Sequence, residues 1–362
     1  MDSKKWFRNF IILLLVLFAL AGGLVAFVDP FFHYRKPRDY FYYTLYEQRS
    51  QNDGITKHFD YDSIITGTSM AENFRPSIFD EEMGTNSIKV TYAGATYKEI
   101  NDNLKVAYNT GHEIRYVFRP LDYSLLVRDK DELRLDLGEY PDYLTNKNPF
   151  DDVEYYLNKE VIVRYTMPVI LRWMRGEPGG YTSFDEYSYN GDKNVYSIDQ
   201  VRDSIVNVRY SDTENEATDE ELKMLEENVE QNVVSLARQH PETTYIYFFP
   251  PYSMAYWQIT KDEGNLGKQI VFVKNAVEQM LECDNIHIYN FALAEEITGN
   301  LDNYMDVAHY SPAINDYIEK ELAAEEKSGE VGEFRLTGEN YEEYFKELTK
   351  FLYEYDYSSL FN

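Results

Sequence analysis

Short apolar segments and amphipathic segments alternate between residues 62 and 118, and this alternation constrains the fold more than any other feature. Segments 62–66, 87–92 and 114–118 are rich in β-branched and aromatic residues, which predicts three strands. Segments 70–82 and 97–109 lie between those strands and are predicted helices, the first of them broken near Pro76. Strands and helices in this order predict parallel βαβ units, whose crossovers are right-handed.

The same alternation returns in the second half of the chain. A capping-box pattern at residues 218–221 opens a predicted helix. Predicted strands at 244–249 and 286–290 follow, each with a predicted helix after it, at 267–282 and 312–324. We therefore expect an α/β fold, a flavodoxin-like three-layer α/β/α sandwich with a five-stranded parallel sheet.

The regular pattern is lost from residue 124 to residue 212. This interruption is too long for an ordinary loop, so we expect a large, partly helical insertion after the third strand. Its place in the chain suggests a cap over the carboxyl ends of the strands, where such folds bind their ligands.

An uncharged, mostly apolar run covers residues 9–28, after the basic residues Lys4, Lys5 and Arg8. A helix of this length spans about 30 Å, enough to cross the hydrocarbon core of a membrane. Basic residues before the run favour a cytoplasmic N-terminus, which would place everything after Asp29 outside the cytoplasm.

Two observations bear on this membrane assignment. The basic residues between positions 35 and 38 lie beyond the run and count against the orientation. A cleaved signal peptide is the alternative, but the run exceeds a usual signal-peptide core and lacks a clear Ala-x-Ala exit. We expect a single-pass protein of the cell membrane with its folded part extracytoplasmic.

These signals predict four segments along the chain. Residues 1–28 form the membrane anchor, and residues 29–60, which are aromatic and polar, form a neck. Residues 61–325 form the α/β domain, with the cap-like insertion at about 124–212. Residues 326–362 form an acidic, Tyr-rich C-terminal tail, either docked or loosely ordered, with one more predicted helix at 339–353.

Charge and cysteine content exclude several classes of function. The net charge of −28 repels polyanions, so we expect no nucleic-acid partner. Cys283 is the sole cysteine, which excludes an intrachain disulfide and a cysteine-rich metal site. The histidines are scattered without ligand spacing, and no glycine-rich phosphate loop occurs. We therefore expect neither a metal nor a cofactor.

Ser69 and His309 are the candidate catalytic residues. Ser69 follows the first predicted strand in a Gly67-Thr68-Ser69 turn and precedes a predicted helix, whose N-terminus would favour negative charge. His309 follows the last predicted strand, three residues after Asp306. Both strands end at one edge of the expected sheet, so Asp306 could orient His309 and His309 could activate Ser69.

Each of these signals has an ordinary structural explanation. A Gly-Thr-Ser sequence after a strand is more often a helix cap than a nucleophile. An Asp three residues before a His is common by chance. Their joint placement on the first and last strands of the expected sheet is what favours a catalytic site.

The order of these motifs resembles the SGNH (GDSL-like) hydrolase superfamily, in which a serine follows the first strand and an Asp-x-x-His lies near the C-terminus. Thr68 stands where the standard hydrolases have Asp. This departure, and the anchor followed by Asp29-Pro30-Phe31-Phe32, resemble the membrane-tethered DltD-like and AlgJ/AlgX-like branch. That branch acts in teichoic-acid D-alanylation and alginate O-acetylation.

The resemblance also implies where an oxyanion would bind. The loop 92–96 resembles the second block of the superfamily, whose glycine N–H group lines the oxyanion hole, and Gly94 is the residue at that place. Taken alone, Gly94 is equally well explained as a turn glycine with positive φ.

The third block departs from the superfamily pattern. Standard members supply an Asn side chain there, whereas this chain has Arg119-Pro120-Leu121-Asp122. An ionised Asp122 cannot donate, so the third donor is missing or comes from Arg119, Asn73 or Asn103. Loss of one oxyanion donor costs roughly 3 to 4 kcal/mol of transition-state stabilisation.

The resemblance implies an extracytoplasmic acyltransferase or esterase that acts on O-acyl groups of a cell-envelope polysaccharide or a teichoic-acid-like polymer. It also implies a membrane-bound O-acyltransferase as partner. One alternative is a catalytically inactive SGNH-like module that binds glycan or serves as a scaffold for that acyltransferase. Another is an anchored scaffold in which Ser69 and His309 never meet. The distance between these two side chains separates the alternatives.

Overall fold

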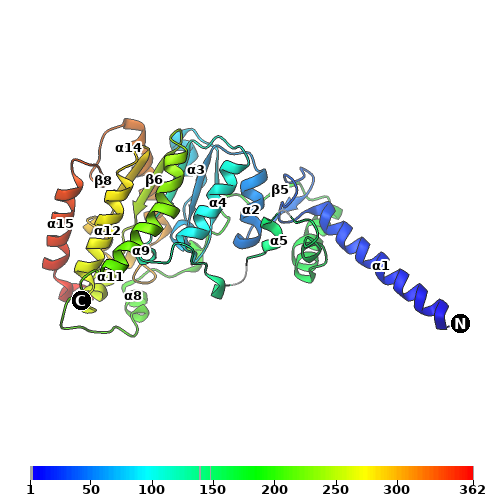
Figure 1. Ribbon diagram of the computed structural model, residues 1–362, viewed down its shortest axis with the longest axis horizontal. Helices are drawn as coiled ribbons and strands as arrows, with labels where there is room; N and C mark the ends of the chain where they lie inside the picture. The colour runs from blue at the N-terminus through cyan, green and yellow to red at the C-terminus, as the bar shows by residue number, and fades with distance from the viewer. Residues whose placement is uncertain (1–2, 138–139, 147, 362) are drawn as a thin grey trace. The chain divides into compact units, whose positions relative to one another are not determined.

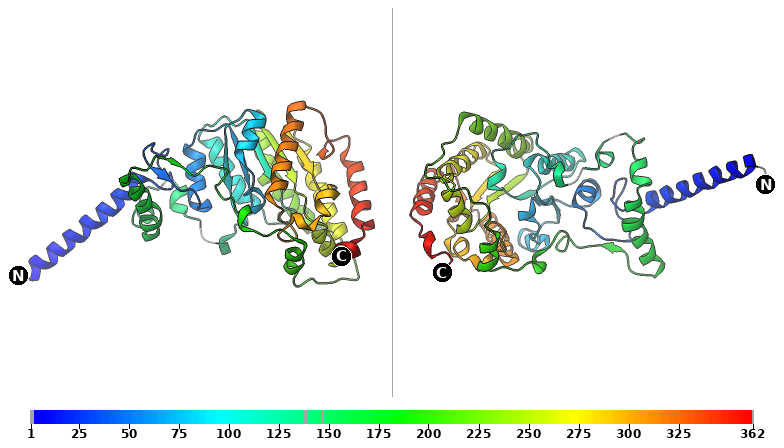
Figure 2. Two further views of the ribbon diagram at one scale, coloured as in Figure 1. Left: turned by 180° about the vertical axis from the view of Figure 1, so that it is seen from behind. Right: turned by 90° about the horizontal axis from the view of Figure 1, so that it is seen from below.

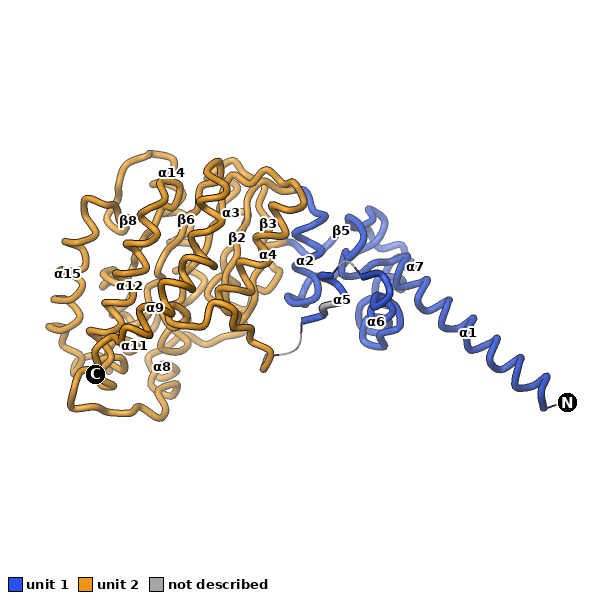
Figure 3. Tube along the Cα trace, in the orientation of Figure 1, with its two compact units in different colours: residues 1–60, 138–183 blue, residues 61–137, 184–362 orange. Residues whose placement is uncertain are grey.

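The computed structural model describes residues 3–137, 140–146 and 148–361, and the chain divides into two units. The N-terminal unit comprises residues 1–60 and 138–183, and the sheet unit comprises residues 61–137 and 184–362 (Figure 3). The expected insertion 124–212 is therefore not one piece. Its middle part folds with the N-terminal segment, and its two ends belong to the sheet unit.

The sheet unit contains a six-stranded sheet in the order β3-β2-β4-β6-β7-β8. Its strands are β2 (Ser63–Gly67), β3 (Ser87–Thr91), β4 (Tyr116–Pro120), β6 (Thr244–Phe249), β7 (Ile286–Asn290) and β8 (Arg335–Leu336). All neighbours from β3 to β7 are parallel, and β8 is antiparallel to β7. The expected mixed α/β fold with a mainly parallel sheet is confirmed, but the sheet has a sixth, antiparallel strand.

Helices lie on both sides of this sheet (Figures 1 and 2). Helices α3 and α14 contact each other, and so do helices α9 and α12. The longer helices are α3 (Pro76–Met83), α4 (Tyr97–Asn109), α9 (Asp219–Val229), α11 (Met254–Asp262), α12 (Leu266–Met280), α14 (Pro312–Ser328) and α15 (Tyr341–Glu354). The short ones are α8 (Ile198–Ser204), α10 (Ser235–Gln239), α13 (Glu295–Thr298) and the π-helical η6 (Glu230–Val234).

Burial explains the sequence of the central strands. Residues 245–249 of β6 are all buried, and they are aromatic or apolar throughout. A strand covered by helices on both faces needs apolar side chains at every position, so it shows no alternation. The capping box at Thr218 and Glu221 forms as expected and opens α9.

The expected C-terminal tail is part of the folded sheet unit. Strand β8 adds to the sheet edge beside β7, and α15 buries Tyr344, Phe345, Leu348 and Leu352. Tyr344 also donates a hydrogen bond to the carbonyl of Asn290 at the end of β7. The tail therefore completes the edge of the sheet.

The N-terminal unit begins with α1 (Ser3–Val28), which is long and apolar enough to cross a membrane. Its other elements are β1 (Tyr42–Tyr43), α2 (Gln48–His58), α5 (Asp142–Thr145), α6 (Val153–Tyr156), the π-helical η4 (Val161–Thr166), α7 (Met167–Met174) and β5 (Gly180–Tyr181). Strand β1 pairs with β5 in parallel, which joins the expected neck to the middle of the expected insertion.

Asp29 ends α1 and organises the chain after it. It adopts a positive φ of 53°, a conformation that Asp tolerates better than most residues. Its buried carboxylate accepts hydrogen bonds from the N–H groups of His33 and Tyr34 and from the hydroxyl of Tyr155. Residues 29–60 are thus folded within this unit. Gly54 allows close packing there, because a Cβ atom would lie 2.1 Å from the carbonyl oxygen of Phe31.

Candidate active site

Ser69 lies in a tight turn at the carboxyl end of β2. Gly67, the last residue of the strand, has φ +148°, and a Cβ atom there would lie 2.9 Å from that of Ala71. Only glycine fits this close turn. Ser69 then opens a single 3-10 turn, η1 (Ser69–Ala71), and the next helix begins at Pro76. The break expected near Pro76 is thus confirmed, and because no long helix begins directly at Ser69, a helix dipole contributes little at this position.

The loop that carries His309 is held by hydrogen bonds to its own carboxylate. Asp306 Oδ1 accepts from the N–H groups of Ala308 and His309 at 2.8 and 2.7 Å. The Ser253 hydroxyl donates to the carbonyl of Val307 at 2.7 Å, which ties the loop to the start of α11. These bonds fix the backbone on both sides of the imidazole.

Ser69, His309 and Asp306 form a continuous hydrogen-bonded chain. Ser69 Oγ lies 2.8 Å from His309 Nε2, and His309 Nδ1 lies 2.7 Å from Asp306 Oδ2. In the tautomer that carries its proton on Nδ1, His309 donates a hydrogen bond from Nδ1–H to Asp306. Its Nε2 atom then accepts a hydrogen bond from the Ser69 hydroxyl. The structure thus brings together the three residues that the sequence placed at one edge of the sheet, in the geometry of a nucleophile, a base and an orienting acid.

The charges of this chain reinforce one another. Burial opposes the charged imidazolium, but the hydrogen bond and attraction from Asp306 outweigh it, so the pKa of His309 is raised. Burial likewise opposes ionised Asp306, but His309 and the N–H donors outweigh it, so the pKa of Asp306 is lowered. Asp306 therefore stays ionised where His309 titrates.

A small pocket of about 60 Å³ opens beside Ser69 and His309. Its lining is mixed polar and apolar and comprises Ser69, Met70, Asn73, Asn190, Met305, His309, Tyr310 and Asn315. The Tyr310 hydroxyl and Asn315 Oδ1 are buried there, and neither has a hydrogen-bond partner among the described residues. Buried polar groups normally have partners, so these two atoms are exceptions in the wall of the pocket.

Asn73 presents a donor to this pocket. Its Oδ1 atom accepts from the N–H groups of Asn190 and Gly191 at 3.0 and 3.1 Å, which fixes the orientation of the amide. Because Oδ1 is held in this way, Nδ2 points elsewhere and donates to none of the residues that the structure describes. Among the expected third donors, Asn73 is the one that lines the pocket.

Asp122 has a different environment from the one expected of an oxyanion donor. Its carboxylate accepts hydrogen bonds from the hydroxyls of Thr68 and Tyr252, both at 2.8 Å. Burial raises the pKa of Asp122, although both hydroxyls and His309 act in the opposite direction. Asp122 thus accepts hydrogen bonds from its neighbours and positions Thr68, the residue before Ser69.

Arg119 points away from the pocket. It is fully buried, its guanidinium donates to the carbonyl of Asn232, and it stacks on the rings of Tyr97 and Tyr247. The sequence made Arg119 a candidate for the third oxyanion donor, but its side chain does not reach the pocket. Successive residues of a strand face opposite sides of the sheet, and Arg119 on β4 faces the side that Asn232 and Tyr97 occupy. Arg119 and Asp122 therefore lie in separate environments.

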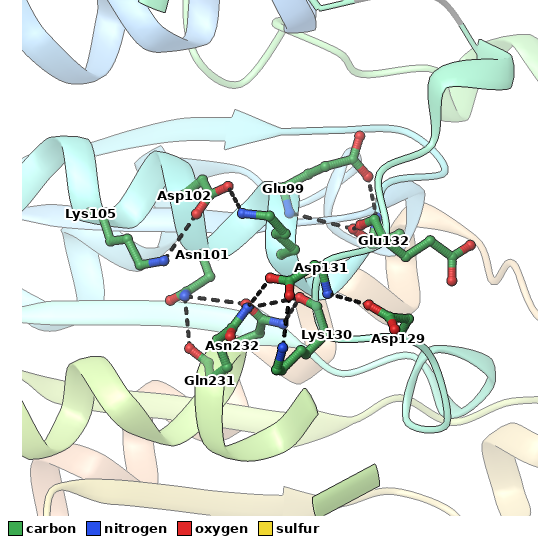
Figure 4. A network of polar contacts seen from close by, with 12 residues as sticks. Glu99, Asn101, Asp102, Lys105, Asp129, Lys130, Asp131, Glu132, Gln231 and Asn232 are labelled. Atoms are coloured by element: carbon green, nitrogen blue, oxygen red, sulfur yellow. Dashed lines mark hydrogen bonds and ion pairs between the residues drawn. The ribbon is translucent and has the colours of Figure 1, made fainter. Parts of the chain in front are cut away.

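Asn232 also takes part in the polar network that holds the chain after β4 (Figure 4). Its amide donates to the carbonyl of Lys130, and Asn101 donates to the Asn232 side chain and to the carbonyl of Gln231. The network joins α4 and η6 to residues 129–132. Its function is structural, because none of these residues lines the pocket.

Gly94 follows β3 with φ +67°, as a turn glycine does. The N–H group of Tyr92 donates to the carbonyl of Gly67, so the loop 92–96 adjoins the Ser69 turn. The N–H groups of Ser69 and Gly94 donate to no residue in the described part of the chain. Asn103 is buried on α4 and does not line the pocket.

Five pocket residues escaped the sequence reasoning, of which three are polar: Asn190, Tyr310 and Asn315. Asn190 lies in the irregular segment, which gave no strand or helix pattern to place it. Tyr310 directly follows His309, and Asn315 lies one turn into α14, so their proximity to the histidine was a usable signal. No group of three or more potential metal-ligating residues occurs in the part of the chain that the structure describes.

No protein-family model matches the chain, and no curated protein matches it significantly.

Proposed function

We propose that this protein is a membrane-anchored serine esterase or O-acyltransferase that acts on O-acyl groups of a cell-envelope glycan. The observation that carries the proposal is the unbroken chain from Ser69 Oγ through His309 to Asp306. Hydrogen-bonded serine, histidine and carboxylate groups are the arrangement that activates a serine for attack on an acyl group.

In the proposed reaction, Ser69 Oγ attacks the ester carbonyl carbon while its proton passes to His309 Nε2. The tetrahedral intermediate collapses, and the leaving alkoxide takes that proton from His309. The acyl group is then esterified to Ser69. Water or a sugar hydroxyl attacks the acyl-enzyme with His309 as base, which releases a carboxylic acid or a new ester and restores Ser69.

Three donors are available for the oxyanion of the intermediate. The N–H groups of Ser69 and Gly94 lack acceptors among the described residues, and Asn73 Nδ2 lines the same pocket as Ser69. We assign Asn73 the part that the third-block Asn has in SGNH hydrolases. Each such donor lowers the barrier by roughly 3 to 4 kcal/mol when it is preorganised.

The pocket favours a short acyl group. Its volume of about 60 Å³ leaves no room for a long fatty acyl chain. A short acyl group such as acetyl fits this volume.

The glycan is proposed from anchoring and charge. Strand order in the parallel part of the sheet agrees with a flavodoxin-like SGNH fold, and we include the DltD-like and AlgJ/AlgX-like branch in the proposal. The net charge of −28 favours a neutral or cationic polymer over a polyanionic one. Outside the cytoplasm the acyl groups would come from a membrane-bound O-acyltransferase.

A fluorophosphonate probe tests the nucleophile in the full chain, solubilised in detergent. We expect covalent labelling of the wild type on the peptide that contains Ser69 and none in Ser69→Ala. Ser124→Ala removes an exposed serine elsewhere in the sheet unit and should label like the wild type. Acetyl esters should also be hydrolysed faster than octanoyl esters, because of the pocket size.

Absence of labelling in a wild type that is folded by circular dichroism would overturn the esterase proposal. That outcome would favour the inactive module that binds glycan or a membrane acyltransferase. Equal labelling of the wild type and Ser69→Ala would assign the reactive serine to another position.

A further inference from the structure

A helical stretch in the N-terminal unit lies against the end of the apolar helix α1. Helices α6 and η4 both contact α1, and Figure 2 shows the green stretch that includes them running across its C-terminal end. Val25 of α1 is buried in a cluster with Phe31, Tyr155 and Val161. This stretch, residues 150–174, is therefore fixed next to the point where α1 would leave a membrane.

The stretch is apolar on two faces. One face is buried and includes Val161 and Val169, which pack within the unit. Other apolar side chains of the stretch are exposed, and together they are called its exposed face here: Phe150, Val153, Leu157, Val163, Leu171, Trp173 and Met174. Phe150 is 86% exposed and Met174 is 71% exposed. A helix that is apolar on its outer side as well as its inner side is typical of contact with lipid.

Aromatic contacts fix the level of this exposed face along α1. Phe27, in the last turn of α1, packs edge-on against Phe41 at 5.5 Å, and Phe41 packs edge-on against Trp173 at 5.9 Å. Arg38 lies over the ring of Phe27 and donates to its carbonyl. Trp173 is therefore level with the last turn of α1. Tryptophan and a nearby arginine are typical of the boundary between lipid and water.

Charges near the face are mostly paired with one another. Arg164 pairs with Glu160 at 3.1 Å, and Glu177 lies within 4 Å of both Arg172 and Arg175. Residues 150–174 contain four acidic and three basic residues, so attraction to anionic lipid is not the main interaction. Burial of apolar side chains is the interaction that remains.

We propose that residues 150–174 form an interfacial membrane-binding element that lies in the bilayer that α1 spans. Phe150, Val163, Leu171, Trp173 and Met174 insert at the boundary between headgroups and acyl chains. The proposal rests on the membrane anchoring of α1 that is part of the proposed function. Insertion of this face holds the N-terminal unit against the membrane surface, so the unit does not swing freely on a flexible tether.

The test uses the full chain with Cys283→Ala and single cysteines labelled with an environment-sensitive fluorophore. Leu15→Cys reports on α1, Met174→Cys on the proposed element, and Lys350→Cys on exposed α15. The protein is reconstituted into phosphatidylcholine vesicles that contain a nitroxide near the headgroup or deep in the acyl chains. We expect the deep nitroxide to quench position 15, the shallow one to quench position 174, and neither to quench position 350.

The outcomes separate the anchor from the element. Quenching at position 15 without quenching at position 174 overturns the interfacial element and leaves the anchor intact. No quenching at position 15 overturns the anchor itself, and the element with it. A label at position 174 that is blue-shifted but not quenched by either lipid indicates a protein partner on this face, which also overturns the proposal.

A charged variant supplies a second measurement on a folded protein. Leu171→Glu and Met174→Glu change exposed side chains, so the fold should tolerate them. With both changes present, a label at Val163→Cys should lose its quenching by the shallow nitroxide, while position 15 keeps its quenching. Unchanged quenching at position 163 would contradict insertion of this face.

Discussion

The Thr68 hydroxyl donates a hydrogen bond to Asp122 Oδ2 over 2.8 Å, and the same Oγ1 atom accepts from the N–H group of Met70. This hydrogen bond joins the turn after β2, which carries Ser69, to the chain segment that follows β4. Asp122 replaces the expected oxyanion donor, and its geometry makes it a positioning residue for the nucleophile turn.

Replacing Asp122 by alanine should destabilise the protein. The change leaves the buried hydroxyls of Thr68 and Tyr252 without their acceptor, at a cost of about 1 to 3 kcal/mol for an unsatisfied group. Urea unfolding should show a lower midpoint, and Asp122→Asn should lose less because its amide oxygen still accepts. Asp199→Ala, at an exposed ion pair with Arg202, serves as the control and should change stability by at most about 0.5 kcal/mol. Equal midpoints for Asp122→Ala and the control would contradict the positioning role.

Labelling of Ser69 should depend on pH through His309. Burial lowers the pKa of His309 less than Asp306 raises it, so the folded value lies above the ordinary 6.5. The neutral imidazole is the base, so the rate of fluorophosphonate labelling should rise with pH through that raised pKa. In Asp306→Asn the raising interaction is lost, so the midpoint should move to lower pH. The plateau rate should fall by up to about 10⁴-fold, because the imidazole loses its orienting partner.

Asn73→Asp should separate the two functions of the Asn73 amide. Aspartate keeps an oxygen for the N–H groups of Asn190 and Gly191 but replaces the Nδ2 donor with a second oxygen. Ester turnover should fall by about 10² to 10³-fold, which is typical for the loss of one oxyanion donor. Asn103→Asp, on α4 and outside the pocket, is the matched change. If the two variants lost the same activity, Asn73 would have no specific part in the reaction.

Lys89 should make stability depend on pH in the alkaline range. It is fully buried on β3, and burial lowers its pKa to about 7, despite the attraction of Asp185, Glu319 and Glu72. In the unfolded chain its pKa is near the ordinary 10.5. Between these values the unfolded state binds the additional proton, so the free energy of unfolding should rise with pH, by an amount on the order of a few kcal/mol.

Comparison of the wild type with Lys89→Met isolates this contribution. The ammonium of Lys89 donates to the carbonyls of Glu72 and Phe74, so the variant should be less stable at every pH. The informative quantity is the difference between the two unfolding free energies, measured in urea at pH 7 and pH 9.5. That difference should grow with pH, and a constant difference would show that Lys89 titrates normally.

Much of the sheet and the reactive chain could be predicted because both depend on local patterns. The strands 244–249 and 286–290 coincide with β6 and β7, and a parallel sheet brings the ends of its strands to one edge. Ser69 and His309 follow strands at that edge, so their meeting could be predicted from strand order without knowledge of side-chain packing.

The remaining features depend on tertiary contacts that leave no local pattern. Strand β8 has two residues, and it exists because β7 offers an unpaired edge. The Asp122 carboxylate accepts hydrogen bonds from Thr68 and Tyr252, which lie in two distant segments of the chain. The sequence alone could not show that this carboxylate already has two donors. The division of residues 124–212 between two units also depends on long-range packing, above all that of Tyr155 against Asp29 and Phe31.

The interleaving of the two units has a consequence for how the protein is made. The N-terminal unit draws on residues 1–60 and 138–183, and the first half of the sheet unit lies between them in the chain. A growing polypeptide must therefore hold β2, β3 and β4 while the earlier unit is still incomplete. Assembly of the first unit waits for residue 183, and the sheet waits for β6 and β7. The N-terminal unit can therefore be completed first, but only while β2, β3 and β4 lack their partner strands, so a chain truncated at residue 183 should expose unpaired strands and aggregate.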